Sequence, residues 1–135
     1  MEIKPRLLRK DILYPELSYK ITGLCLQVKK ELGRFAKEKQ YCDSLEEKLK
    51  ENKIKHTREF TIKGTGNRID FIIDDCILLE IKARPYVTKE DYFQTQRYLH
   101  VLKLKLGMIV NFQAVYVKPY RVINHEINNE RIISW

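Results

Sequence analysis

Residues 68–82 have the sequence RIDFIIDDCILLEIK, in which two short apolar runs flank the pair Asp74-Asp75. Runs of this kind, separated by turn-forming residues, predict a β-hairpin. Asp70 lies within the first run, and Glu80 and Lys82 end the second. A charge on a largely buried strand is unfavourable unless it is paired or binds a metal ion. The hairpin therefore determines both the fold and the position of a candidate site.

The length of the hairpin loop decides whether the two acids meet. A two-residue loop would pair Asp70 with Leu79 and turn Glu80 to the opposite face. A three-residue loop, residues 74–76, would pair Asp70 with Glu80. We predict the three-residue loop, because aspartates tolerate turn and left-handed backbone conformations. Glu80 and Lys82 share a face in either case, since side chains alternate along a strand.

Two helices and a strand are predicted before the hairpin. Apolar residues at helical spacing run from Leu17 to Leu32, between Pro15 and Gly33. A second helix is expected from about residue 37 to residue 52, and its apolar stripe consists of Tyr41, Cys42, Leu45 and Leu49. Alternating side chains after residue 55 predict a strand, and residues 64–67 predict a turn.

The chain after the hairpin predicts a further helix and a buried strand. Thr88 is expected to cap a helix that continues to about Leu104. Residues 106–112, LGMIVNF, predict a buried strand paired in parallel with an earlier one. Residues 115–117 and 121–123 are expected to add edge strands. The order ααβββαβ predicts an α/β fold, a mixed β-sheet flanked by helices, in one domain over residues 1–135.

The composition narrows the class of protein. No apolar run is long enough to span a bilayer, and the N-terminus lacks the apolar segment of a signal peptide, so we expect a cytoplasmic protein without membrane contact. Three cysteines without CxxC spacing predict neither a zinc site nor a disulfide framework. The net charge of +8 favours a polyanionic partner such as nucleic acid. The alternative is a basic protein with no such partner.

The three charged residues of the hairpin suggest metal-dependent chemistry. Two opposed carboxylates repel each other, and a divalent cation would remove the conflict. Carboxylate oxygens suit Mg²⁺ or Mn²⁺. Lys82 would then orient or help to deprotonate an attacking water, or offset charge in the transition state. The alternative is a buried salt bridge between Lys82 and one acid. The triplet acid-x-lysine carries little weight by itself, because it also occurs at residues 2–4 and 46–48.

Three residues outside the hairpin could extend this site. Glu38 precedes Tyr41 and Cys42 by three and four residues, so it is expected near the inward face of its helix. Gln94 and Tyr98 are four residues apart on the helix that follows the Glu80 strand. They would therefore share a face and could steady a phosphate or Lys82.

These residues together resemble a known nuclease pattern. The spacing Asp70…Glu80-Ile81-Lys82 is similar to the core motif of the PD-(D/E)xK nuclease superfamily, and residues 94–98, QTQRY, are similar to the QxxxY motif of its RecB-like branch. Within that superfamily, the chain most resembles the GxxExxY proteins. The segments that carry this resemblance are LSYKITGLCLQVKKELG (17–33), EKQY (38–41), RIDFII, LLEIKA, QTQRYL and KLGMIVNF. The glycine that names that family is Phe35 here.

The resemblance implies a restriction-endonuclease-like αβββαβ core and a set of site residues. It implies metal ligands at Glu38, Asp70, Glu80 and the backbone carbonyl of Ile81. It also implies that Lys82 serves the nucleophilic water. With Gln94 and Tyr98, the expected catalytic set is Asp70, Glu80, Lys82, Gln94 and Tyr98.

The expected function is Mg²⁺-dependent (or Mn²⁺-dependent) hydrolysis of nucleic-acid phosphodiesters in DNA processing, repair or defence, with DNA expected in preference to RNA. Basic residues near the site would hold the phosphate backbone, and the candidates are Arg58, Lys63, Arg68, Arg84 and Arg97. The alternative is a non-catalytic module that keeps the fold and binds nucleic acid or a partner. The small size also suggests a homodimer or a protein partner.

Overall fold

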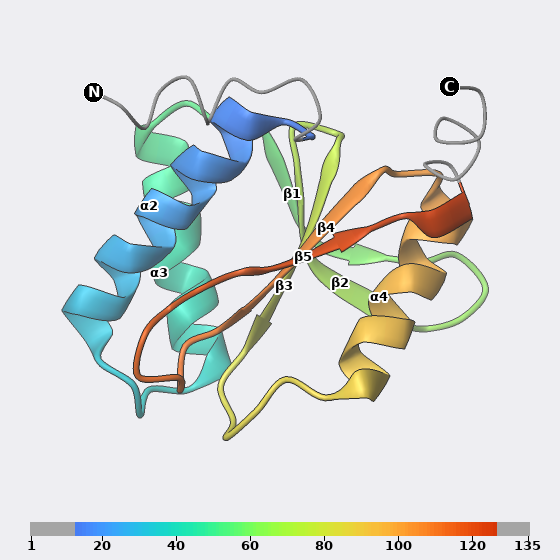
Figure 1. The fold of residues 1–135 in the computed structure, drawn as a ribbon. Coiled ribbons are helices and arrows are strands. Elements are labelled where there is room, and N and C mark those ends of the chain that lie inside the picture. Colours follow the sequence, from blue (N-terminus) through green and yellow to red (C-terminus); the bar gives the residue numbers. More distant parts are fainter. Residues whose placement is uncertain (1–12, 127–135) are drawn as a thin grey trace.

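The computed structural model describes residues 13–126 and arranges them as a sheet between two helical layers (Figure 1). The elements, in chain order, are α2 (Pro15–Leu32), α3 (Glu38–Glu51), β1 (His56–Thr61), β2 (Arg68–Ile73), β3 (Ile77–Lys82), α4 (Lys89–Leu102), β4 (Leu106–Asn111) and β5 (Tyr120–Ile123). The predicted order ααβββαβ and the edge strand predicted at residues 121–123 are confirmed.

The strands form one mixed sheet in the order β1-β2-β3-β4-β5. β3 and β4 are parallel, and the other neighbouring pairs are antiparallel. Helix α4 connects the two parallel strands, as a parallel crossover requires. Figure 1 shows α2 and α3 on one face of the sheet and α4 on the other. The predicted mixed sheet flanked by helices is therefore confirmed.

Each face of the sheet has its own apolar core. The larger core packs α2 and α3 against alternate residues of the central strands, among them Phe71, Leu79 and Val110. The smaller core packs α4 against the opposite residues, among them Leu78 and Ile109. The chain of α4 approaches β4 closely at Gly107, where an added Cβ would lie 2.7 Å from a methyl group of Thr95.

The helices begin and end where the sequence predicts. Pro15 opens α2, and Gly33 follows it with φ 75°, a conformation that glycine adopts without strain. The Thr88 hydroxyl accepts a hydrogen bond from the Asp91 N–H, and the Asp91 carboxylate accepts one from the Thr88 N–H in return. This reciprocal cap fixes the start of α4 directly after β3.

The hairpin between β2 and β3 has the predicted register. Ile73 pairs with Ile77, so three residues form the loop. Asp74 and Asp75 adopt left-handed conformations, with φ 51° and 57°. The Lys55 ammonium forms an ion pair with Asp75, and the Lys55 carbonyl accepts a hydrogen bond from the Asp74 N–H. The loop is thus held to the start of β1, and the register places Asp70 opposite Glu80.

The edge strand predicted at residues 115–117 is wrong. This segment is part of an irregular connection between β4 and β5. The Lys29 ammonium donates hydrogen bonds to the carbonyls of Phe112 and Ala114. These carbonyls are therefore already bonded and do not pair with a neighbouring strand. Pro119 then removes a backbone donor just before β5. In the described part of the chain, no helix is long and apolar enough to cross a membrane.

Candidate active site

Asp70 and Glu80 face each other where regular pairing of β2 and β3 ends. The paired residues run from Ile73–Ile77 to Phe71–Leu79, and the next two residues are the acids. The Asp70 carboxylate accepts a hydrogen bond from the Ile81 N–H (2.7 Å), and the Glu80 carboxylate accepts one from the Asp70 N–H (3.2 Å). The two carboxylates therefore bind backbone donors at the end of the ladder, which fixes them beside each other.

A reversal of strand faces at Asp70 opens this position. Residues two apart on a regular strand share a face, yet Phe71 packs in the core of α2 and α3 whereas Ile69 packs in the core of α4. The neighbouring strand changes at the same level, because Glu59 lies between the paired residues Arg58 and Phe60 and has φ 55°. The alternating sequence pattern did not predict this change in either strand.

The carboxyl pair is electrostatically strained. Glu80 is only 5% exposed, and Asp70 is half-buried. Burial, together with the negative charge of Asp70, raises the pKa of Glu80 to about 8. Two adjacent acids that resist simultaneous ionisation suit a bound cation, which would favour the charged form of both. The hard oxygen donors of this pair fit a divalent metal ion of the Mg²⁺ type.

Lys82 lies on the same face of β3 as Glu80, and its side chain is held from the side of α4. Its ammonium is 3.9 Å from a carboxylate oxygen of Asp91. Asp91 also forms an ion pair with Arg84. Burial by itself would raise the pKa of Asp91, but the Thr88 N–H, Arg84 and Lys82 together lower it. The nearest acid that pairs with Lys82 is therefore Asp91, rather than Asp70 or Glu80 as the salt-bridge alternative assumed.

Gln94 and Tyr98 lie on the face of α4 that is turned toward Glu80. Tyr98 is 7% exposed. Burial and the charge of Glu80 raise the pKa of the Tyr98 hydroxyl, and a hydrogen bond from Gln94 acts in the opposite direction. The tyrosine thus remains a neutral hydrogen-bond donor at ordinary pH.

Glu38 lies in the first turn of α3 and is exposed. The hydroxyl of Tyr41 fixes the loop before it, donating to the Gly33 carbonyl (2.6 Å) and accepting from the Ala36 N–H (3.1 Å). Phe35, which stands where the related pattern has glycine, is 79% exposed. The loop accommodates it because the side chain points to solvent, where the Arg34 guanidinium lies over its ring.

One pocket of about 390 Å³ contains the acids, Lys82 and the α4 pair, and its lining residues are Glu38, Glu59, Gly66, Asn67, Arg68, Ile69, Asp70, Glu80, Lys82, Gln94 and Tyr98. The six side chains predicted to bind metal or act in catalysis thus line the same pocket, while the N–H of Ile81 donates to Asp70 and its side chain lies in the core. Within residues 13–126, no three His, Cys, Asp or Glu side chains come close enough to form a metal cluster.

The basic residues predicted to bind nucleic acid differ in position. Arg68 lines the pocket and forms an ion pair with Glu59 (3.1 Å). Arg58 points away from it, because it pairs with Asp43 (2.7 Å) and Glu46 (3.1 Å) and lies over the Phe71 ring.

The other three basic candidates lie outside the pocket lining. Arg84 pairs with Asp91, Lys63 is exposed in the turn after β1, and Arg97 is exposed on α4. Asp91 and Glu59 were not among the predicted site residues. Asp91 pairs with Lys82 and Arg84 from outside α4, and Glu59 pairs with Arg68 of β2, so the neighbouring sequence does not single them out.

The family of the chain follows from its sequence over the whole of this fold. The model of the PD-(D/E)XK nuclease superfamily matches residues 15–123, from the start of α2 to the end of β5. The chain belongs to the PD-(D/E)XK nuclease superfamily. Its members are usually nucleases and typically use divalent metal ions, so the family supports an enzyme that acts on nucleic acid. The assignment agrees with the mixed sheet and its flanking helices.

A crystal structure described as that of SSO0001 is similar to this one, with 21% sequence identity and a TM-score of 0.48. The similarity covers 84% of this chain and 71% of that chain. No curated protein matches the sequence.

Proposed function

We propose that the protein is a divalent-metal-dependent nuclease that hydrolyses phosphodiester bonds at the pocket containing Asp70, Glu80 and Lys82. The observation that supports this most strongly is the buried carboxylate pair at the interrupted end of the β2–β3 ladder. Such a pair is unfavourable in a purely structural role, because each charge raises the free energy of the other. Its presence in a polar pocket of a basic protein favours catalysis.

The metal ligands in this proposal are Asp70, Glu80 and the backbone carbonyl of Ile81, with Mg²⁺ or Mn²⁺ as the ion. A bound divalent ion supplies Lewis-acid stabilisation of the phosphate and a more acidic water. Mg²⁺ commonly keeps several waters and takes only one or two carboxylates. Glu38 would then act through a water of hydration, which is consistent with its exposed position at the start of α3.

The remaining side chains of the pocket have roles in binding and charge stabilisation. Lys82 would stabilise the negative charge that develops on the phosphate oxygens and help to orient the attacking water. Asp91 would position Lys82, whose ammonium lies 3.9 Å from it. Gln94 and Tyr98 would donate hydrogen bonds to the phosphate, and Arg68 would hold the backbone beside it.

The motifs around Glu38 and Gln94 support a narrower assignment. Tyr41 fixes the loop before Glu38, and Gln94 lies beside Tyr98, so both tyrosines of the ExxY and QxxxY patterns have a structural reason to be present. We therefore place the chain in the GxxExxY group of the RecB-like branch. We further propose one domain over residues 1–135, a cytoplasmic location and DNA as the preferred substrate, with a homodimer or protein partner contributing to substrate selection.

A cleavage panel tests the function. End-labelled single-stranded, duplex and branched DNA and single-stranded RNA are incubated with the protein in Mg²⁺, Mn²⁺ or EDTA. Wild type should cut at least one substrate only with metal, and Glu80→Gln and Lys82→Met should lose that activity. Glu47→Gln and Lys20→Met, at exposed helical positions, serve as matched controls. Equal residual cleavage in wild type and both site variants would refute the proposal.

A further inference from the structure

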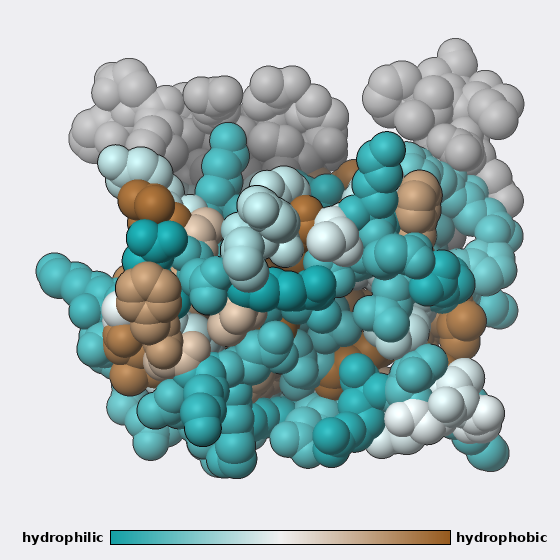
Figure 2. Space-filling view, turned by 90° about the horizontal axis from the view of Figure 1, so that it is seen from below, coloured by the Kyte–Doolittle hydropathy of each residue, from teal (hydrophilic) through white to brown (hydrophobic). Residues whose placement is uncertain are grey.

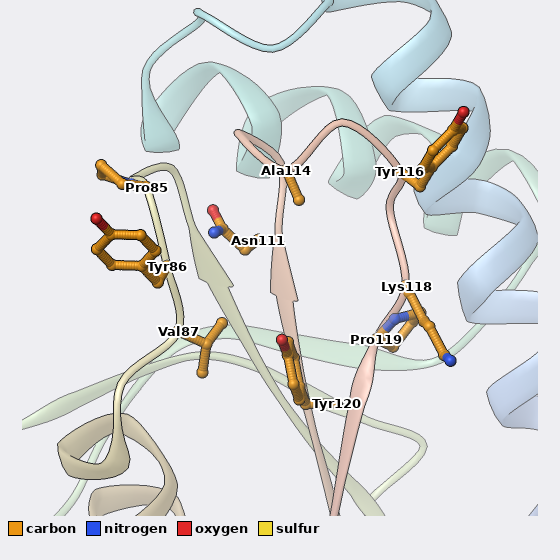
Figure 3. Close-up of a pocket in the computed structure, with 9 residues that line it drawn as sticks. All are labelled: Pro85, Tyr86, Val87, Asn111, Ala114, Tyr116, Lys118, Pro119 and Tyr120. Carbon is orange, nitrogen blue, oxygen red and sulfur yellow. The ribbon is translucent and has the colours of Figure 1, made fainter.

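A second hollow lies beside the candidate active site and is rich in tyrosine. It has a volume of about 370 Å³ and is formed by the connection from β3 to α4 and by the connection from β4 into β5 (Figure 3). Tyr86 contributes from the first connection, and Tyr116 and Tyr120 contribute from the second and the start of β5. We call this hollow the tyrosine groove.

The three rings of the tyrosine groove are unusually accessible. Tyr86 is 75% exposed, Tyr116 is 85% exposed and Tyr120 is 57% exposed. Large aromatic side chains are normally at least partly buried, and several exposed ones around a single hollow indicate a binding surface. Pro85 and Pro119 precede Tyr86 and Tyr120 directly and restrict the backbone beside them. The backbone at Tyr86 and Tyr120 would therefore lose less conformational freedom on binding.

The tyrosine groove and the candidate active-site pocket meet at one pair of neighbouring strand residues. Asn111 lines the groove, Lys82 lines the pocket, and the two residues are partners in the parallel β3–β4 ladder. Neighbouring strands lie about 5 Å apart, so the groove begins next to Lys82. The Asn111 amide bonds the backbone of Arg84 twice, at 3.2 and 2.7 Å, which holds the β3–α4 connection and its Tyr86 in place.

The chemistry of the tyrosine groove favours a nucleic acid strand with unpaired bases. Among residues 13–126, no acidic residue lines it, and Lys118 provides a positive charge at its edge (Figure 3). Figure 2, which looks at the lower end of Figure 1, shows that hydrophilic side chains cover most of this end of the molecule. Aromatic side chains stack on exposed base faces, and those faces are accessible only where a strand is unpaired. A nucleic-acid backbone that leaves the pocket along the groove would meet the positive charge of Lys118.

We propose that the tyrosine groove binds the unpaired nucleotides adjacent to the scissile phosphate, and that the preferred substrate is single-stranded nucleic acid or a single-stranded flank. The inference rests on the proposed nuclease function for the position of the scissile phosphate. Tyr86, Tyr116 and Tyr120 would stack on bases, and Lys118 would contact the backbone. The tyrosines would act as specificity-determining residues, since a duplex offers them no free base faces.

The test is a binding assay with metal removed, so that cleavage does not interfere. Fluorescence anisotropy measures the affinity of the full chain in EDTA for a labelled oligothymidylate, for an abasic strand of equal length and for a duplex. We expect the oligothymidylate to bind at least about fivefold more tightly than the abasic strand, as the loss of a single base stack would predict. Equal affinity for these two strands would overturn the proposal.

Substitutions assign the effect to the tyrosine groove. Tyr86→Ala and Tyr120→Ala should each weaken binding of the oligothymidylate by about fivefold or more, whereas the matching Tyr→Phe variants should bind within about twofold of wild type. Tyr19→Ala is the control, because Tyr19 is 56% exposed on α2 and does not line the tyrosine groove. Circular dichroism verifies that each variant is folded. Alanine variants that bind as wild type does would overturn the proposal.

Cleavage separates this inference from the proposed function. If tyrosine-dependent strand binding is observed but no substrate is cut, the nuclease proposal fails and the groove stands as a strand-binding surface. If wild type cuts duplex as fast as single strands, and the alanine variants cut at the wild-type rate, the nuclease proposal stands and the tyrosine-groove proposal fails.

Discussion

Replacing Glu80 by glutamine should make the metal-free protein more stable at alkaline pH. Burial and the Asp70 carboxylate raise the pKa of Glu80 from 4.5 to about 8. The folded protein therefore binds more protons than the unfolded chain between these values, and the free energy of unfolding falls as the pH rises. The stability that the protonated Glu80 provides is fully present below about pH 4.5 and is lost above about pH 8. Glutamine removes the charge and keeps an oxygen that can accept the Asp70 N–H.

The size of the effect follows from the shift in pKa. A change from 4.5 to about 8 corresponds to at most about 5 kcal/mol, at about 1.4 kcal/mol per pH unit. Relaxation of the pocket and entry of water reduce this energy. We therefore expect the free energy of unfolding of Glu80→Gln to exceed that of wild type by about 2–5 kcal/mol above pH 8. The two proteins should converge near pH 4. Urea denaturation in EDTA, followed by circular dichroism across this pH range, measures the difference.

Glu47→Gln is the matched control, because Glu47 is exposed on α3 and should show no pH-dependent gain. Parallel stability curves for wild type and Glu80→Gln from acid to alkaline pH would refute the electrostatic account of the carboxyl pair. Mg²⁺ added at pH 8 should stabilise wild type in proportion to the logarithm of its concentration above the Kd, and should stabilise Glu80→Gln much less.

Two further predictions concern packing and thiol chemistry. Gly107→Ala should lower the free energy of unfolding by about 1–3 kcal/mol, because its Cβ would meet the Thr95 methyl group at 2.7 Å. Urea denaturation measures this, and adding Thr95→Ser, which deletes that methyl group, should recover part of the loss; no recovery would contradict the close contact. Iodoacetamide should label Cys76 in the native protein before Cys25 and Cys42, because Cys76 is partly exposed whereas the other two thiols are buried in the core. Mass spectrometry identifies the site, and first labelling at either buried thiol would contradict the core assignment.

The local sequence was sufficient to predict the elements and the hairpin register. Helical spacing located the face of α2, and the residues that make it are buried as expected. The Asp74-Asp75 pair predicted a three-residue loop with left-handed backbone. That loop length places Asp70 opposite Glu80 rather than Leu79. The helix face and the loop length depend on residues close together in the chain, so both can be predicted from one sequence.

The features that were missed depend on residues far apart in the chain. Lys82 pairs with Asp91 because α4 starts beside the end of β3, a proximity that the residues around Asp91 do not reveal. Arg58 was expected at the site, but α3 supplies two acids that hold it elsewhere. The reversal at Glu59 and Asp70 is a backbone change, which side-chain alternation alone cannot reveal.

The measurement that most directly tests the central claim is the single-turnover rate of cleavage for the substrate that wild type cuts fastest, in Mg²⁺. Glu80→Gln and Lys82→Met should each lower this rate at least about 100-fold, because the first removes a charged metal ligand and the second removes a charge that stabilises the reacting phosphate. EDTA should abolish cleavage, and Lys20→Met should leave the rate unchanged. A rate within about twofold of wild type in Glu80→Gln, with the same dependence on Mg²⁺, would contradict the assignment of this pocket as the active site.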